Sequence, residues 1–475
     1  MSDTRDSVLV PSEVLAKVIS VAMSTGADFA EVFVEDTSTE SLVADDGRMK
    51  DANSGRDRGA GVRVMKGDSS SYCFVDSLEE SALLDAARTA AAAVNGARGD
   101  FVVDLTRKTV PPVSPVKKPH ASLAKPFKVE MLMAADAAAR AYDPLIKQVT
   151  VGLTENVRST TIANSEGLLV ADSQTRTLFT VNTVASKNGV TQTGYVRRGK
   201  SMGLELLDIW TPVECGRDSA RQAIVNLHAA PAPSGPMTVV MTNGWGGVLF
   251  HEACGHSLEA DGIMRGSSVF AGKIGQKVGN SVVTAVDDPT VSNEWGSYGV
   301  DDEGNPARRK VLIENGVLQD YMWDRKNAKK GSHAMTGNGR RESYRYIAIP
   351  RMSNTCIWNG DSKAEDILSG TDEGLYAKGL RGGQVDSATG DFVFVVSEAY
   401  LIKNGKLGDA VRGATLTGNG LAVLNEIDAV ADNLDFGPGM CGKAGQSVPA
   451  ACGQPTLRIR KITVGGTSRR ERGNR

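Results

Sequence analysis

The sequence is poor in cysteine and in aromatic residues, and it lacks long apolar runs. Six cysteines in 475 residues are too few for a disulfide scaffold, and no Cys-x-x-Cys pair occurs among them. No run of about 18 apolar residues is present, which excludes a conventional membrane helix. The N-terminus has no basic region followed by an apolar stretch, so no secretory signal is expected. These absences predict a cytoplasmic protein whose reduced thiols are available for metal binding or catalysis.

The chain also lacks an excess of either charge. Its 54 basic and 56 acidic side chains give a formal net charge of -2, which argues against a nucleic-acid binder built on a broad basic surface. Hydrophobic residues make up 41% of the chain, enough for a sizeable core. Its 52 glycines are about 11% of the residues, against about 7% in an average protein, and they predict many turns and close backbone approaches.

The first hundred residues show alternating helical and strand patterns. Ser12 is placed to cap a helix whose apolar residues recur with 3.6 periodicity up to about residue 22. Residues 30–35 read as a strand, and residues 62–75 read as a hairpin that turns around Lys66-Gly67-Asp68. Ser77 and the glutamate three residues later have the spacing of a capping box that opens a second helix, over residues 78–90. These patterns predict an α-β-β-α module.

Two proline-rich stretches divide the rest of the chain. Five prolines lie between residues 101 and 126, and three more lie between residues 231 and 236. The predicted fold class is α+β, with an N-terminal α/β region up to about Pro231 and a β-rich C-terminal domain after it. The predicted division is an α-β-β-α module over 1–100, a linker and middle α/β domain over 101–230, and the C-terminal domain over 231–475.

Only five histidines occur, and two of them form the pattern His-Glu-x-x-x-His. These are His251 and His256, with Glu252 directly after the first. A chance match to this pattern is expected in roughly a few of a thousand chains of this composition. A predicted strand over residues 238–241 and a glycine-rich loop over residues 243–247 precede the pattern. The order strand, loop, pattern therefore places it on a helix that opens from a glycine-rich turn.

The spacing of the two histidines raises a geometric problem. Zinc-binding helices place histidines at i and i+4 because those positions share one face. Here the separation is five residues, so on a regular helix the imidazoles of His251 and His256 would diverge by about 140°. A π-bulge would return them to one face. Alternatively, Gly255 could let the helix loosen just before the second histidine.

A hydrolytic zinc site needs a third protein ligand and an open position for water. The spacing leaves the choice of this ligand open among seven residues: Cys254, Glu259, Asp261, His333, Cys356, Cys441 and Cys452. Cys441 lies in residues 436–443, which read as a rigid, turn-rich loop that could present its thiol. A thiolate beside two imidazoles suits zinc. Glu252 follows the first histidine and could act as general base on a metal-bound water.

Several segments together resemble the TldD/PmbA family of zinc metallopeptidases, on its TldD branch, over nearly the whole chain. The segments that carry the resemblance are 250–259, 337–341, 350–354, 416–420, 439–443 and 445–449. The resemblance implies one zinc ion per chain held by His251, His256 and Cys441, with Glu252 as the catalytic base. It makes the C-terminal domain the metallopeptidase domain. Cys452 is an extra thiol relative to the family pattern.

The resemblance also implies a substrate class and a partner. Proteolysis of peptides and unfolded polypeptides is expected, for peptide maturation or for degradation of small unfolded proteins, in a chamber between two subunits. The PmbA-like sister subunit of this family, also called TldE, lacks the metal motif, and this chain keeps it. This chain is therefore expected to be the active member of a heterodimer with such a paralogue, with a homodimer as the other possibility.

Other interpretations of the same residues stay open. The ligands would equally serve a zinc hydrolase of a small-molecule amide, and a non-enzymatic regulatory subunit is a further class. Arg340, Arg341 and Arg351 could clamp a peptide or form salt bridges. His333 could stabilise an oxyanion. Glu259 could support an imidazole or be a solvated carboxylate.

Overall fold

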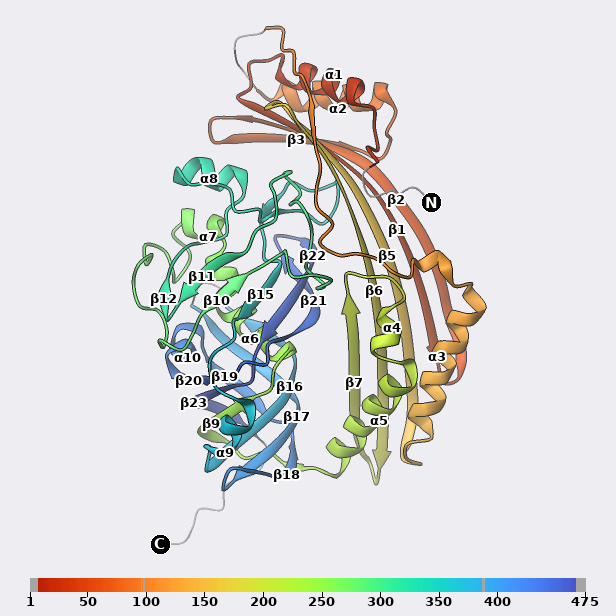
Figure 1. The fold of residues 1–475 in the computed structure, drawn as a ribbon, viewed down its shortest axis with the longest axis vertical. Helices are drawn as coiled ribbons and strands as arrows, with labels where there is room; N and C mark the ends of the chain where they lie inside the picture. Colours follow the sequence, from red (N-terminus) through yellow and green to blue (C-terminus); the bar gives the residue numbers. More distant parts are fainter. Residues whose placement is uncertain (1–6, 95, 97–98, 387–388, 467–475) are drawn as a thin grey trace.

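The computed structural model describes residues 7–94, 96, 99–386 and 389–466. A largely antiparallel sheet flanked by helices forms the N-terminal part, and a β-rich C-terminal part follows it (Figure 1). The predicted α+β class is therefore confirmed. The N-terminal sheet has seven strands, in the order β3-β2-β1-β5-β6-β4 with β7 beside β6. They are β1 (Phe29–Asp45), β2 (Arg48–Lys66), β3 (Ser69–Val75), β4 (Thr106–Lys108), β5 (Ile146–Asn164), β6 (Leu168–Lys187) and β7 (Val190–Lys200).

Helices cover the two ends of this sheet. They are α1 (Ser12–Met23), α2 (Glu80–Ala92), α3 (Lys125–Arg140), α4 (Leu206–Ile209) and α5 (Pro212–His228). Helices α1 and α2 lie together at one end of the long strands, and α3 and α5 run along the other end (Figure 1). Each pair buries its own apolar cluster, because the apolar stripe of each helix meets the alternating apolar positions of the strands.

The C-terminal part contains a barrel. The sheet that forms it has eight described strands: β8 (Ala230–Pro231), β9 (Gly235–Met241), β16 (Glu373–Val385), β17 (Asp391–Lys403), β18 (Lys406–Arg412), β19 (Thr415–Asn419), β20 (Ile427–Val430) and β23 (Leu457–Gly465). The pairing order is β16-β9-β23-β19-β17-β18-β8, and β16 pairs with β17 as well, which closes β16, β9, β23, β19 and β17 into a ring. Closure removes the free edges of these five strands.

A second C-terminal sheet lies beside the barrel. It has the order β12-β11-β10-β15-β22-β21. Its strands are β10 (Ala285–Asp287), β11 (Lys310–Glu314), β12 (Val317–Leu318), β15 (Asn354–Ile357), β21 (Asp435–Lys443) and β22 (Gln446–Gln454). A two-stranded ribbon and short helices complete this part: β13 (Gly339–Arg340), β14 (Ile349–Pro350), α6 (Val248–Phe250), α7 (Ala260–Met264), α8 (Arg325–Gly331), α9 (Ala364–Ser369) and α10 (Gly420–Glu426). The largest apolar core lies between the barrel and this sheet.

Tight two-residue turns fix the register of many neighbouring strands. Positive φ at both turn residues is the signature of type I′ turns, which Asn-Gly and Asp-Gly pairs favour. Five such pairs have positive φ at both residues: Asp46–Gly47, Asn188–Gly189, Asn315–Gly316, Asn404–Gly405 and Ala444–Gly445. The last of them joins β21 to β22, with Lys443 paired to Gln446 across the turn. This turn sets the register of the hairpin that carries Cys441.

Two predicted helix caps are wrong, although both helices exist. The N-cap of α1 is Pro11, and Ser12 is its first helical residue. The N-cap of α2 is Glu79, without a side-chain capping bond. The Ser77 hydroxyl accepts a hydrogen bond from the Glu79 backbone N–H at 3.2 Å instead. A serine just before a helix can satisfy a nearer backbone group in a local turn, and that bond competes with the capping box.

The first strand is longer than its apolar alternation predicted. The prediction covered residues 30–35, and β1 continues to Asp45, with exposed or half-exposed side chains at 36–41 and buried ones at Leu42 and Ala44. It pairs with β2 on one side and β5 on the other along this length. Backbone pairing on both edges maintains the strand through the exposed stretch. Among the described residues, no helix has the length and apolarity needed to cross a membrane.

Ion pairs join the N-terminal sheet and its helices to the C-terminal part. Arg63 of β2 pairs with Glu303, and Arg341 pairs with Glu31 of β1, with all four side chains buried. A third pair links Arg221 of α5 to the barrel strand β17. The two terminal guanidinium nitrogens of Arg221 donate to the two carboxylate oxygens of Glu398, each at 2.9 Å.

Glu398 provides a test of this contact. Burial alone would raise the pKa of Glu398, but bonds from Arg221 and Tyr400 outweigh burial and lower it to about 2. Glu398→Gln is therefore expected to lower the free energy of unfolding by about 2 kcal/mol at pH 7. This value lies between the usual cost of breaking an exposed ion pair and that of breaking a fully buried one. A carboxylate with a lowered pKa stabilises above its unfolded pKa and loses that effect as the pH falls. The loss measured by urea unfolding should thus be smaller at pH 3.

Glu373→Gln is the matched control for this measurement. Glu373 is an exposed carboxylate on β16, and its change should cost less than about 0.5 kcal/mol. The expected role of this contact would be wrong if Glu398→Gln lowered the free energy of unfolding no more than the control does. It would also be wrong if the decrease were the same at pH 7 and pH 3.

Candidate metal centre

The His-Glu-x-x-x-His pattern lies on a short segment with three kinds of helical turn. After β9 the chain forms a 3₁₀ turn (Trp245–Gly247), then α6, then a π-helical turn (His251–Gly255) and a second 3₁₀ turn (His256–Leu258). A π-turn accommodates one more residue than an α-turn, so side chains five apart return to one face. The rings of His251 and His256 accordingly lie with their centroids 5.3 Å apart. The π-bulge expected from the spacing is confirmed.

Gly255 has a role other than the one expected from the sequence. Its backbone is helical, with φ of -57° and ψ of -50°, so no loosening occurs at this residue. A Cβ atom there would approach the sulfur of Met352 to 2.3 Å. The glycine is therefore required for close packing of the π-turn against Met352, which lies just before β15.

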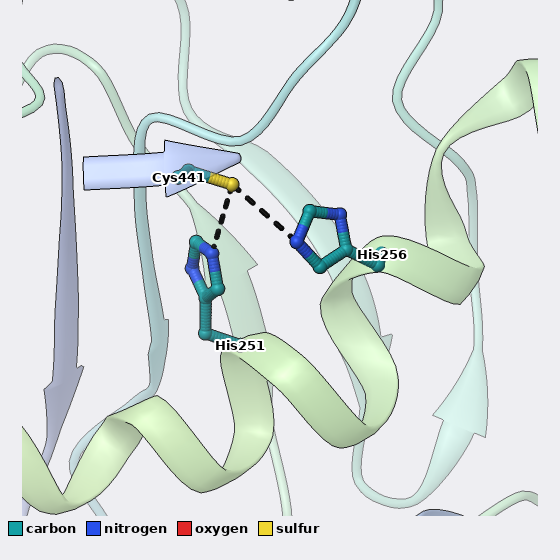
Figure 2. Close-up of side chains that lie close together, drawn as sticks. All are labelled: His251, His256 and Cys441. Atoms are coloured by element: carbon teal, nitrogen blue, oxygen red, sulfur yellow. Dashed lines mark hydrogen bonds between the residues drawn. The ribbon is translucent and has the colours of Figure 1, made fainter. Parts of the chain in front are cut away.

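The third residue of the cluster comes from the far end of the chain. The sulfur of Cys441 is 3.1 Å from Nε2 of His251 and 3.4 Å from Nε2 of His256 (Figure 2). Within the part of the chain that the structure describes, these three residues form the group of histidine, cysteine and carboxylate side chains that could hold a metal ion. Their ligand atoms all lie within 4.8 Å of one another.

The segment around Cys441 is a strand rather than the turn-rich loop expected from its glycines. It forms β21 of the β21–β22 hairpin, and Cys441 is buried. Cβ atoms at Gly437 and Gly439 would meet the ring of Trp245 at 2.8 and 2.9 Å. These glycines therefore let the strand pack closely on the indole that precedes the histidine segment, and the packing brings Cys441 to the histidines.

The charges in the cluster favour the ligating form of the thiol. Burial alone would raise the pKa of Cys441, but His251 and His256 outweigh burial and lower this pKa well below the ordinary value. Burial alone would lower the pKa of both histidines, but the neighbouring thiols, and Glu259 beside His256, outweigh it and raise both, so metal binding has to release the imidazole protons. A thiolate is the form that binds metals. Two imidazoles and a thiolate suit Zn²⁺, and a tetrahedral ion with ordinary Zn–N and Zn–S bonds needs ligand atoms about 3.6 Å apart. The residues present therefore fit zinc.

Glu252 lies beside the cluster at the edge of a cleft. Its Oε2 is 3.7 Å from Nε2 of His256, the nitrogen that faces Cys441, and its side chain is 32% exposed. The cleft has a volume of about 580 Å³. It is lined by Glu252, His256, Ser257, Glu259, Asp261, Gly262, Arg265, Ser267, Ser268, Gln384, Val385, Gly442 and Lys443. A carboxylate in this position can reach both the metal side of the imidazole and a molecule in the cleft.

The other candidate ligands are placed elsewhere. Cys254 and Cys356 are buried, and burial raises the pKa of both thiols. Cys452 lies against His251 on the neighbouring strand, outside the group of three ligand atoms. Asp261 is paired with cations at the edge of the cleft. His333 stacks on Trp323, and its Nδ1 donates a hydrogen bond to the carbonyl of Ala334 at 2.8 Å.

The three arginines named from the sequence are buried and form structural contacts. Arg341 donates to Glu31, Arg340 donates to the carbonyl of Met352 at 2.6 Å, and Arg351 donates to the carbonyl of Cys441. None of the three is among the residues that line the described cleft.

Glu259 is the one supporting residue that the sequence pattern raised and the structure brings to the cluster. It is fully buried, and its Oε2 lies 3.0 Å from Nδ1 of His256. Burial alone would raise the pKa of Glu259, but Lys443 and His256 outweigh burial and lower it to about 2. Lys443 was missed from the sequence. The alternation of a strand was the available signal, because residues 441 and 443 share one face of β21.

Comparisons with known proteins agree with this geometry. Family models match three consecutive segments: "PmbA/TldA metallopeptidase domain 1" at 30–94, the "central domain" at 118–227 and the "C-terminal domain" at 234–466. A Haemophilus influenzae protein named "Metalloprotease TldD homolog" is 38% identical over 98% of this chain and 100% of its own length. A Saccharolobus solfataricus protein named "Zinc metalloprotease TldD homolog" is 26% identical over 95% of this chain and 99% of its own.

A solved structure has the same fold. The crystal structure of TldE from Thermococcus kodakarensis superimposes with a TM-score of 0.77, at 21% identity, over 95% of this chain and 100% of that one.

The two neighbouring thiols give a direct test of the cluster. Cys441→Ser should lose most of the bound zinc, because a hydroxyl is a far weaker ligand than a thiolate. Cys452→Ser is the matched control, since Cys452 is also buried, lies on the paired strand and is outside the ligand group. Elemental analysis of the purified proteins measures the result. Full zinc content in Cys441→Ser would remove this residue from the site.

Proposed function

We propose that this chain, which belongs to the TldD/PmbA metallopeptidase family, is a zinc-dependent endopeptidase that cleaves peptides and unfolded polypeptides. Curated relatives at 35–38% identity over most of the chain are metalloproteases. The observation that carries the proposal is the meeting of His251, His256 and Cys441 beside the partly exposed carboxylate of Glu252. One zinc ion per chain would be held by these three ligands, which leaves a fourth position open to the cleft.

The chemistry divides between the metal and the chain. Zinc, when bound, polarises the scissile carbonyl and lowers the pKa of water. Glu252 takes a proton from the attacking water at its carboxylate and returns it to the leaving amine. Its partial exposure at the edge of the cleft lets it reach the substrate, while His251 is buried and serves only as a ligand. The cleft walls hold the peptide so that its carbonyl lies between the ligand cluster and this carboxylate.

The form of the cleft supports a peptide more than a small molecule. A small-molecule hydrolase is expected to enclose its substrate, whereas a peptidase needs a groove that is open along the chain of the substrate. Here Gln384 and Gly442, which lie on β16 and β21, are exposed at the margin of the cleft. Strand residues at an open margin suit main-chain pairing with an extended peptide, which gives weak side-chain specificity.

A purely regulatory role is less well supported. A scaffold subunit needs neither three metal ligands nor a base beside them. In this chain Glu252 and His256 line the cleft, and the other two proposed ligands, His251 and Cys441, lie next to His256. The physiological substrate would then belong to peptide maturation or to the degradation of small unfolded proteins.

The proposal extends to a partner and to the division of the chain. We expect a heterodimer with a PmbA/TldE-like paralogue, or else a homodimer. The likeness of this chain to a TldE structure supports the first, because two chains of one fold can pair about a pseudo-twofold axis. The division into 1–100, 101–230 and 231–475 is supported by the limits of the three family models.

Glu252→Gln separates catalysis from metal binding. The amide keeps the size of the carboxylate but cannot accept the proton, so zinc content and thermal stability should be unchanged. Turnover of an unfolded peptide should fall by about 10²- to 10⁴-fold, the usual contribution of a general base, with little change in peptide affinity. The measurements are elemental analysis, peptide cleavage rates and binding of a fluorescent peptide.

Glu365→Gln is the control for this variant, because Glu365 is exposed on α9 and is not among the residues that line the described cleft. Loss of zinc in Glu252→Gln would make Glu252 a ligand, and cleavage near the wild-type rate would place the base elsewhere.

The assembly is tested separately by light scattering. The purified chain should be a dimer, or should form one when mixed with its metal-free paralogue, and peptide cleavage should rise with dimer formation. A monomer that cleaves peptides at full rate without a partner would exclude a chamber between subunits.

A further inference from the structure

We infer that Glu259, Lys443 and Arg351 form a buried charge cluster that positions the metal ligands, with Glu259 holding His256 in its ligating orientation. The inference rests on the proposed metal site and assigns a supporting role to residues beyond the three ligands. The need for such a device follows from the origin of the ligands. Two of them lie on the helical segment after β9 and the third lies on β21, so the site exists only if the two segments keep a fixed relation.

The contact between Glu259 and His256 fixes the imidazole. Oε2 of the fully buried carboxylate lies 3.0 Å from Nδ1 of His256. A carboxylate on one ring nitrogen selects the tautomer that carries its proton there and leaves the lone pair on the other nitrogen. That other nitrogen, Nε2, is the one that lies 3.4 Å from the Cys441 sulfur.

Lys443 ties the same carboxylate to the cysteine strand. Its Nζ lies 2.8 Å from Oε2 of Glu259 and 2.6 Å from Oδ1 of Asp261. Lys443 is two residues beyond Cys441, so both side chains leave β21 on the same face. The carboxylate that orients one ligand is thus bonded to the strand that supplies another.

Arg351 closes the cluster from the opposite side. Its side chain is fully buried, and its Nε lies 3.9 Å from Oε1 of Glu259. Its terminal nitrogens donate to the carbonyl of Cys441 and, at 3.3 Å, to the carbonyl of Gln446. These two carbonyls belong to β21 and β22. One guanidinium therefore holds both strands of the hairpin against the carboxylate.

His251 has a different environment. Its Nδ1 is buried and forms no hydrogen bond of ordinary geometry, and the Cys452 thiol lies against its side chain. His251 therefore lacks the carboxylate contact that His256 has. Within the cluster, Glu259 is the carboxylate that contacts Lys443, Arg351 and His256 together, whereas Asp261 contacts Lys443 and not the imidazole. Removal of the Glu259 carboxylate should therefore release His256 first.

Zinc affinity of the purified full-length chain tests the role of Glu259. Glu259→Gln should bind Zn²⁺ about 10- to 100-fold more weakly in competition with a chromophoric chelator, the usual effect of losing a partner of a ligand imidazole. Glu259→Asp should lose affinity as well, although it keeps the charge, because the shorter side chain does not reach Nδ1. Asp261→Asn is the matched control. It removes the other carboxylate on Lys443 without touching His256, so its affinity should stay within about threefold of the wild type.

The absorption spectrum of the protein with Co²⁺ in place of zinc provides a second measurement. A change in overall stability alone would not alter this spectrum. The thiolate-to-metal absorption should persist in Glu259→Gln because Cys441 still binds, while the ligand-field bands should change as His256 is released. Thermal unfolding of the metal-free protein shows whether Glu259→Gln folds. If it does not, zinc affinity and the Co²⁺ spectrum are measured on Glu259→Asp instead.

Unchanged zinc affinity and an unchanged Co²⁺ spectrum in the folded Glu259 variants would overturn the inference. The inference would also be overturned if Asp261→Asn lost as much zinc affinity as Glu259→Gln. The loss would then come from the change of charge around Lys443 and not from the contact with His256. Failure of the wild-type chain to bind Zn²⁺ at all would instead overturn the proposed function, so the two failures are distinguishable.

Discussion

Three candidate ligand atoms from two distant segments meet within 4.8 Å, and much of the C-terminal part is arranged around that contact. The barrel strand β9 leads into the histidine segment, and the paired strands β21 and β22 bring the cysteine. Glycines allow the backbones to approach where the two segments touch. A Cβ atom at Gly247 would lie 2.3 Å from the carbonyl oxygen of Gly453 on β22. The metal centre is thus a product of close backbone packing as much as of the ligand side chains.

Two of the places where charge is buried show two different roles for it. Between the N-terminal sheet and the C-terminal part, pairs such as Arg63–Glu303 and Arg341–Glu31 are fully desolvated. Pairs of this kind contribute little net stability, but a wrong docking of the two parts would leave single charges buried, so they favour one arrangement. At the metal centre, Glu259 is buried between cations and next to a ligand. There the Glu259 carboxylate orients one side chain, His256, whereas the other pairs orient the N-terminal sheet against the C-terminal part.

Local patterns in the sequence predicted which helices and strands occur better than they predicted the residues at which these begin and end. The helix after residue 11 and the hairpin around Gly67 follow from periodicity and turn residues, and both occur. The two predicted caps are wrong because a serine near a helix start has several backbone groups within reach, and the sequence does not say which is nearest. The segment around Cys441 was mistaken for a loop because its glycines serve contact with Trp245, and contact of that kind depends on a residue almost two hundred positions away.

The sequence by itself determined the class of the fold and the helical segment with its two histidines. Because the histidines are five residues apart, it also predicted either a π-turn or a loosening at Gly255, and the structure has the π-turn. It left the third ligand open among seven side chains, and only the resemblance to a family pointed to Cys441. The tertiary structure decided which thiol lies 3.1 Å from His251 and that His256 is bonded to Glu259. It also decided between the two roles left open for Arg340, Arg341 and Arg351, which form structural contacts. The reason is physical. Periodicity and spacing act over a few residues, whereas the distance between the histidine segment and β21 is fixed by strand pairing and packing across the whole C-terminal part.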